Sequence, residues 1–329
     1  MRESEGGIRR LQDLRGYLAL WIMFGHCCMF MSGAGPVLKC IQKLDLLCVG
    51  LFFFLSGYGL FASLENKKDY LRSFLLKHPV KLVALALISC MVNLFIQCAL
   101  GHRGSAEELA VFYRSVWGSV NWYVWEQCYF YLVFFVLGLL VRNRTLRLVL
   151  LLIPCVLLIE FTRRSDLGQA YYVSTLAFPA GAFLYEYGDR AAGFYRKHRL
   201  AVLAVLILLA GVSYFSQRFP MRHALAAYGK NLLCVSVCFL AAALALDGLI
   251  PRGNSLLTKL SLGIYLYHLV AINAVSTWMA KHDMKRGYAF MVAVALLTMF
   301  FALCEYGIRS GIGRLFGTKM GKITGNRKK

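Results

Sequence analysis

The chain has little charge and few of the features that mark a soluble protein. Only 16% of its 329 residues are charged, it has six prolines, and no linker, internal repeat or low-complexity tract sets off a second domain. Hydrophobic residues make up 59% of the chain, and the mean hydropathy is +0.59. A soluble domain could not cover that much apolar surface, so we expect the bilayer to be the solvent.

Acidic residues are the scarcest charged group. The chain has 16 Asp and Glu against 37 Lys and Arg, which gives a formal net charge of +21. In a soluble protein this excess would indicate a nucleic-acid partner. In a membrane protein it is typical of topology signals and of contacts with lipid headgroups, so we expect membrane lipids and no nucleic acid as partners.

A metal-binding pattern and a disulfide framework are also missing. The eleven cysteines show no zinc-like spacing with histidine, and most lie inside apolar runs as small buried hydrophobes. Cys40 and Cys48 flank a short loop and could pair on an oxidising side of the membrane, but nothing in the sequence fixes their geometry. We expect no metal. The first apolar segment is too long for a cleavable signal peptide and should remain as an anchor.

Long apolar runs predict an all-α, polytopic membrane protein with about ten transmembrane helices. The predicted segments are 13–33, 45–63, 79–100, 120–141, 146–163, 170–187, 199–216, 229–248, 258–278 and 287–308. The connections between them are short. We therefore expect one transmembrane domain over residues 1–308 and a basic cytoplasmic tail over residues 309–329.

The basic residues favour a cytoplasmic N-terminus. With that orientation, about two thirds of the lysines and arginines fall on the cytoplasmic side, as the positive-inside rule requires. An even number of segments returns the C-terminus to the same side. We expect a multi-pass protein of the plasma (inner) membrane with both termini cytoplasmic.

Arg15 and His26 lie eleven positions apart in the first segment. On a helix their directions differ by only about 20°, and the rise between them is about 16 Å. Taken singly, the arginine could merely set topology and the histidine could merely join two helices. On one face together, they favour an anion-binding cation at the cytoplasmic edge and a titratable base near mid-membrane.

Two further stretches contain candidate residues. Residues 52–61 place a serine and two glycines among phenylalanines, which favours tight helix packing or, alternatively, the wall of a groove for a thin ligand arm. Residues 70–81 form a basic stretch that contains Arg72 and Lys77 before a proline. These cations are either topology signals or a second set of phosphate contacts.

Two ionisable residues within later segments complete the candidates. Glu126 follows two tryptophans at the predicted outer interface and is either an exposed interfacial group or a ligand for acceptor hydroxyls. His268 lies about two turns into the ninth segment and is either structural or part of a relay.

In this order the segments resemble the acyltransferase-3 family of integral membrane acyltransferases. Arg15 and His26 are similar to that family's arginine–ten residues–histidine signature, and residues 52–58 (Phe-Phe-Phe-Leu-Ser-Gly-Tyr) to its Phe-Phe-x-Leu-Ser-Gly-Phe stretch. Residues 124–129 resemble a degenerate Val-Glu-Glu-Gln-Phe-Tyr segment. Residues 263–268 resemble its Tyr-x-x-Tyr-Leu-x-His element. The resemblance covers nearly the whole chain.

The resemblance implies the chemistry. The donor is acetyl-CoA or another acyl-CoA on the cytoplasmic side, and the acceptor is a hydroxyl of an extracytoplasmic glycan or lipid-linked sugar. His26 acts as general base or transient acyl carrier, with Glu126 and His268 lining the acceptor or relay path. Arg15, Arg72 and Lys77 bind the phosphates of the donor.

Some features depart from the family. Its paired arginines before the proline are reduced to Arg72 and Lys77, and Trp125 replaces the first acid of the Glu-Glu pair. Many relatives carry a fused periplasmic esterase-like domain. This chain shows none, so we expect it to finish the transfer itself or to hand the acyl group to a separate periplasmic transferase. The alternative function is a transporter or exporter of a polar solute, to which intramembrane Arg, His and Glu are also suited.

Overall fold

The apolar runs form helices throughout the part of the chain that the structure describes. The structure is a computed structural model that describes residues 3–33, 35–101, 110, 122–165, 167–220 and 222–325. No strand occurs among these residues. The predicted fold class, an all-α polytopic membrane protein, is confirmed.

Each of the ten predicted segments overlaps a helix. The helices, in chain order, are α1 (Glu3–Asp13), α2 (Arg15–Phe30), α3 (Pro36–Asn66), α4 (Lys81–Ala99), α6 (Trp122–Leu140), α7 (Arg144–Arg164), α8 (Ala177–Lys197), α9 (Arg199–Phe215), α10 (Ala224–Leu246), α11 (Ser255–Lys281) and α12 (Tyr288–Gly325). Short helical turns among the described residues are η1 (Tyr70–Ser73), the π-helical η2 (Leu76–Val80), η4 (Gln169–Tyr171) and η5 (Ser216–Arg218). The helix α12 continues beyond residue 308, into the stretch expected to be a tail.

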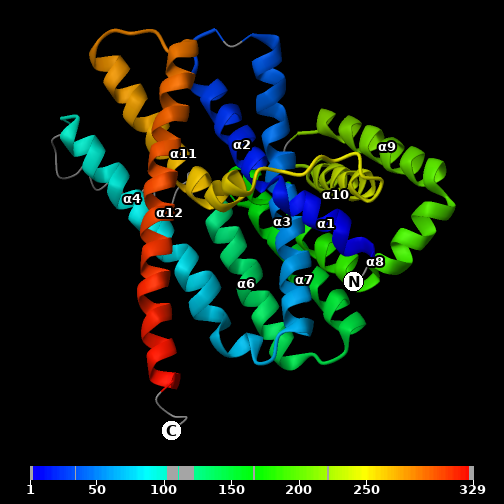
Figure 1. The fold of residues 1–329 in the computed structure, drawn as a ribbon. Coiled ribbons are helices and arrows are strands. Elements are labelled where there is room, and N and C mark those ends of the chain that lie inside the picture. The colour runs from blue at the N-terminus through cyan, green and yellow to red at the C-terminus, as the bar shows by residue number, and fades with distance from the viewer. Residues whose placement is uncertain are drawn as a thin grey trace.

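Fewer helices than predicted are long and apolar enough to cross a bilayer. Within the described ranges there are seven, or up to eight if the bent pair α8 and α9 forms one span. These two helices, predicted as separate spans, meet at 106°. The basic run from Arg196 to Arg199 occupies the break, and α9 lies beside α10 (Figure 1). The helix α2 has only 16 residues.

Small residues bring the central helices into backbone contact. A Cβ on Gly57 of α3 would lie 2.1 Å from the carbonyl oxygen of Phe178, and one on Gly181 of α8 would lie 1.8 Å from that of Phe54. Neither space can hold even a methyl group. The tight packing predicted for residues 52–61 is therefore present, between α3 and α8.

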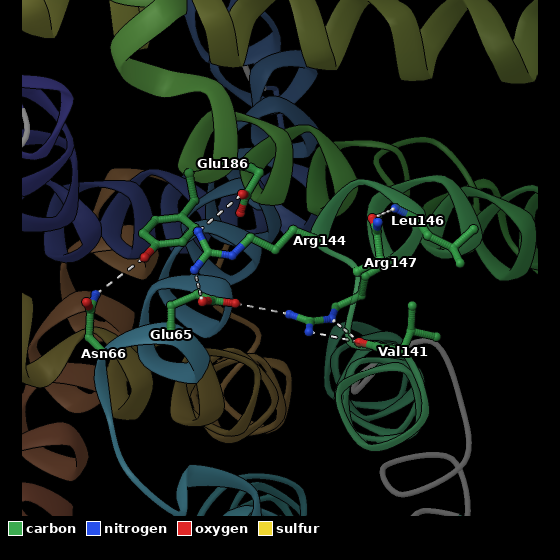
Figure 2. A network of polar contacts seen from close by, with 9 residues as sticks. Glu65, Asn66, Val141, Arg144, Leu146, Arg147 and Glu186 are labelled. Carbon is green, nitrogen blue, oxygen red and sulfur yellow. Dashed lines mark hydrogen bonds and ion pairs between the residues drawn. The ribbon is translucent and has the colours of Figure 1, made fainter.

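A charged network ties the end of α3 and the start of α7 to the middle of α8 (Figure 2). Arg144 pairs with Glu65 and, at 3.5 Å, with Glu186. Arg147 contacts Glu65 at 3.4 Å and donates from Nε and Nη2 to the carbonyl oxygen of Val141 at 3.1 and 2.9 Å. Arg147 is buried, so this network fixes the turn between α6 and α7.

Candidate active site

The side chains of His26 and His268 form the centre of the candidate site. Nδ1 of His26 lies 2.7 Å from Nε2 of His268, and the two rings stack with their centroids 4.9 Å apart. The helices α2 and α11 run side by side from a shared start, where a Cβ on Gly16 would lie 2.4 Å from the backbone of Leu257. His26 lies ten positions beyond Gly16, and His268 eleven beyond Leu257, so the packing at Gly16 sets the pair in register.

The hydrogen bonds of the pair determine which nitrogen of His26 is free. Nδ1 of His268 lies 2.5 Å from the carbonyl oxygen of Tyr265, which can only accept, so Nδ1 carries the proton. In neutral His268 the other nitrogen, Nε2, then accepts, and Nδ1 of His26 must donate to it. The lone pair of neutral His26 is left on Nε2, and this atom is therefore the one that can take a proton from a substrate.

Arg15 lies in the wall of a cavity of about 150 Å³ beside this pair. The cavity lies between α2, α3, α6 and α11, and its lining consists of Arg15, Phe52, Ser56, Tyr123, Tyr131, Ser261, Leu262 and Tyr265. Nε of Arg15 is buried and has no hydrogen-bond partner among the described residues. A guanidinium whose Nε donor is buried and unpaired, among hydroxyl groups, is suited to an anionic ligand.

Tyr265 connects the cavity to the histidine pair. Its ring lines the cavity. The centroid of this ring lies 4.7 Å from that of Tyr123 and 5.5 Å from that of His268. The backbone carbonyl oxygen of Tyr265 accepts the hydrogen bond from Nδ1 of His268. The structure thus brings His26 and His268 into contact and places Arg15 in a cavity that Tyr265 connects to them. His26 itself is not part of the cavity lining, so a ligand in the cavity reaches it past Tyr265.

Ser56 and Gly57 show how the small-residue stretch 52–61 is used. Its neighbour Gly57 packs against α8, whereas Ser56 lines the cavity and accepts a hydrogen bond of 2.9 Å from Nε2 of Gln127. The two interpretations of residues 52–61 therefore hold for adjacent residues. One face of α3 packs tightly and the next forms a groove wall.

Glu126 is buried. The alternative that it is an exposed interfacial group is therefore wrong. Its Oε1 accepts a hydrogen bond of 2.8 Å from Thr175, just before α8, and its Oε2 is buried without a partner among the described residues. Neither the cavity lining nor the hydrogen bonds of the histidine pair include it. A role in catalysis for Glu126 stays a prediction.

Arg72 and Lys77 lie outside the cavity. Arg72 is on η1 and Lys77 on η2, and both side chains are exposed. Their neighbour His78 is turned inward, where its Nε2 lies 3.0 Å from the hydroxyl of Tyr70 and its ring stacks on Phe74. A contact between the donor and Arg72 or Lys77 would have to form at the protein surface.

One residue that the sequence did not single out lies at the centre. Asp45 of α3 places Oδ2 3.8 Å from Nε2 of His26. Its signal in the sequence is slight, since it is a lone acid at the start of an apolar segment and its partner lies on another helix. Gly25 makes room for it, because a Cβ there would lie 3.1 Å from the Cβ of Asp45.

Comparison with known families agrees with the motifs. Residues 10–306 match the model of the acyltransferase-3 family, described as an acyltransferase domain. The matched range contains Arg15, His26, Asp45, Glu126 and His268. No curated protein and no solved structure matches the chain.

Proposed function

Because this chain belongs to the acyltransferase-3 family, we propose that it moves an acetyl or other short acyl group from acyl-CoA to a hydroxyl of an extracytoplasmic glycan or lipid-linked sugar. Family membership makes the chain an acyltransferase, and its apolar helices make it a multi-pass membrane protein. The donor, the acceptor and the direction of transfer are the proposed part.

The free Nε2 of His26 is the observation that carries the proposal. An acceptor hydroxyl gives its proton to this nitrogen while its oxygen attacks the thioester carbon. The carbon–sulfur bond then breaks, and the CoA thiolate leaves with the proton from Nε2. His268 holds the tautomer of His26 throughout, because the bond from Nδ1 of His26 fixes which nitrogen is free.

Arg15 supports the donor half of the proposal. CoA joins a phosphorylated head to a thin arm. The rise from Arg15 to His26 is about 16 Å, a length over which such an arm can extend. The unpaired Nε of Arg15 in the cavity favours phosphate binding there, with the thioester directed past Tyr265 toward His26.

Topology supports the direction of transfer. The bias of basic residues favours a plasma-membrane protein with both termini cytoplasmic, which puts Arg15 on the side where acyl-CoA is made. The acceptor then approaches from the opposite side, where α2 ends and α3 begins. A separate periplasmic transferase is needed only if His26 carries the acyl group to it.

The test is the composition of the cell-envelope glycans from cells with and without this gene, measured by mass spectrometry. The proposal expects a loss of acyl mass from one glycan when the gene is deleted, and regain of that mass with the wild-type gene but not with His26→Ala. An unchanged set of glycan masses would contradict it.

Labelled acetyl-CoA separates this function from that of a transporter. Inverted membrane vesicles present their cytoplasmic face to added donor. An acyltransferase transfers label to a glycan, whereas an exporter of a polar solute transfers none and changes only the distribution of that solute. Absence of labelled glycan together with solute accumulation would favour the transporter.

A further inference from the structure

Asp45 lies beside the nitrogen of His26 that takes the proton. Its Oδ2 is 3.8 Å from Nε2, and the two side chains are 13% and 21% exposed, so a ligand can reach both. No side chain among the described residues donates a hydrogen bond to this carboxylate. Its position is built into the fold, since the glycine at position 25 is what allows α3 to bring Asp45 this close.

This carboxylate does not orient the histidine. In a Ser-His-Asp triad the aspartate accepts from the nitrogen opposite the working one. In this chain that place is taken by His268, at 2.7 Å from Nδ1 of His26. Asp45 lies on the other side of the ring, in the space that an acceptor hydroxyl must enter to reach Nε2.

The chemistry of the carboxylate limits what it can hold there. The 3.8 Å gap is too long for a direct hydrogen bond. An ionised carboxylate only accepts, and a hydroxyl that donates to Nε2 has no second proton for Asp45. The acceptor therefore needs a second hydrogen-bond donor next to the hydroxyl that reacts. The reacting hydroxyl then donates to Nε2 of His26, and the second donor bonds to the carboxylate of Asp45.

We propose that Asp45 binds a neighbouring hydroxyl of the acceptor, so that the enzyme acylates one hydroxyl of a sugar diol and not an isolated alcohol. This inference rests on the proposed function and names its substrate class. Asp45 exchanges no proton. The acylated hydroxyl gives its proton to His26, and Asp45 keeps the bond from the neighbouring hydroxyl before and after transfer.

The experiment uses the envelope glycan of cells that lack this gene, since its hydroxyls are free. Initial rates of transfer from labelled acetyl-CoA are measured in membranes against each substrate. Asp45→Ala is expected to raise the KM for the glycan about tenfold or more and to leave the KM for acetyl-CoA within about twofold. Asp45→Asn keeps an accepting oxygen, so its KM for the glycan is expected to rise less. Asp283→Asn, an exposed carboxylate at the end of α11, is the matched control.

The position of the acyl group is the second readout. Two-dimensional NMR of the product is expected to place it beside a carbon that bears a free hydroxyl. An unchanged glycan KM in Asp45→Ala, or an acyl group without a neighbouring hydrogen-bond donor, would overturn the proposal.

Failure of the proposed function gives a different result. In that case the wild-type membranes themselves transfer no label. Equilibrium binding of the same glycan to the detergent-solubilised protein still decides the role of Asp45. Weaker binding by Asp45→Ala than by Asp45→Asn supports the role, and equal binding by wild type and both variants rejects it. A melting temperature like that of the wild type shows that each variant is folded.

Discussion

His26 and His268 are 242 residues apart in the sequence, and their ring nitrogens lie 2.7 Å apart. The contact depends on the register of α2 against α11, which the close approach of Gly16 to Leu257 sets. It leaves Nε2 of His26 free because the carbonyl oxygen of Tyr265 holds the proton of His268 on Nδ1. Under the proposed mechanism, catalysis therefore depends on His268 even though that residue does not need to contact the acceptor.

Replacement of His268 tests this dependence. His268→Ala is expected to lower kcat about 10²-fold, because His26 loses the partner that fixes its tautomer, with the KM for acyl-CoA unchanged. In His268→Gln the side-chain oxygen can accept from Nδ1 of His26, so part of the rate should return. Steady-state kinetics in membranes measures both. Equal loss in the two variants would show that His268 serves packing alone.

Replacement of Arg15 tests the donor site. Arg15→Gln is expected to raise the KM for acyl-CoA about tenfold or more and Arg15→Lys less, because lysine keeps the charge but not the forked donors. Arg72→Gln and Lys77→Gln serve as comparisons, since both side chains are exposed and outside the cavity. A larger effect at either of these two than at Arg15 would move the phosphate site to the surface stretch 70–81.

The interface of α3 with α8 makes a prediction about stability. Gly57→Ala forces a methyl group against the carbonyl oxygen of Phe178 and should cost about 1–3 kcal/mol. Gly59, two positions along the same helix, has open space around it, so Gly59→Ala should leave the melting temperature equal or slightly higher. Thermal unfolding in one detergent compares them. A loss of stability at both positions would point to helix flexibility and not to the contact with α8.

The charged network of Figure 2 leads to a second prediction about stability. Arg147→Met leaves the partly buried carbonyl group of Val141 without its two donors and should lower stability by about 2 kcal/mol. Arg144→Met should cost less, because the side chain of Arg144 is 50% exposed. Thermal unfolding again provides the measurement, and a larger loss for Arg144 would contradict the assignment.

The sequence predicted the parts of the site that lie on one helix. Helical periodicity alone placed Arg15 and His26 on a common face, and the small residues of 52–61 indicated where α3 packs closely. Runs of apolar residues located the helices, since the bilayer demands such lengths. The sequence did not predict the sharp bend between α8 and α9, because the length of an apolar run carries no information about the direction of the helix it forms.

Contacts between helices were beyond prediction. Asp45 meets His26 across α2 and α3, and Glu126 meets Thr175 across α6 and the start of α8. Neither pairing follows from spacing along one helix, since both depend on how the helices rotate against one another. The tautomer of His26 was equally inaccessible, because it follows from a carbonyl group on α11.

The most direct test is acyl transfer from labelled acetyl-CoA by membranes that hold His26→Ala at the wild-type level. Transfer is expected to fall about 10²-fold or more, to the level of membranes without the protein, because no other group replaces the free Nε2. His282→Ala, at an exposed histidine just after α11, should transfer at the wild-type rate. Wild-type transfer by His26→Ala would contradict the role assigned to His26.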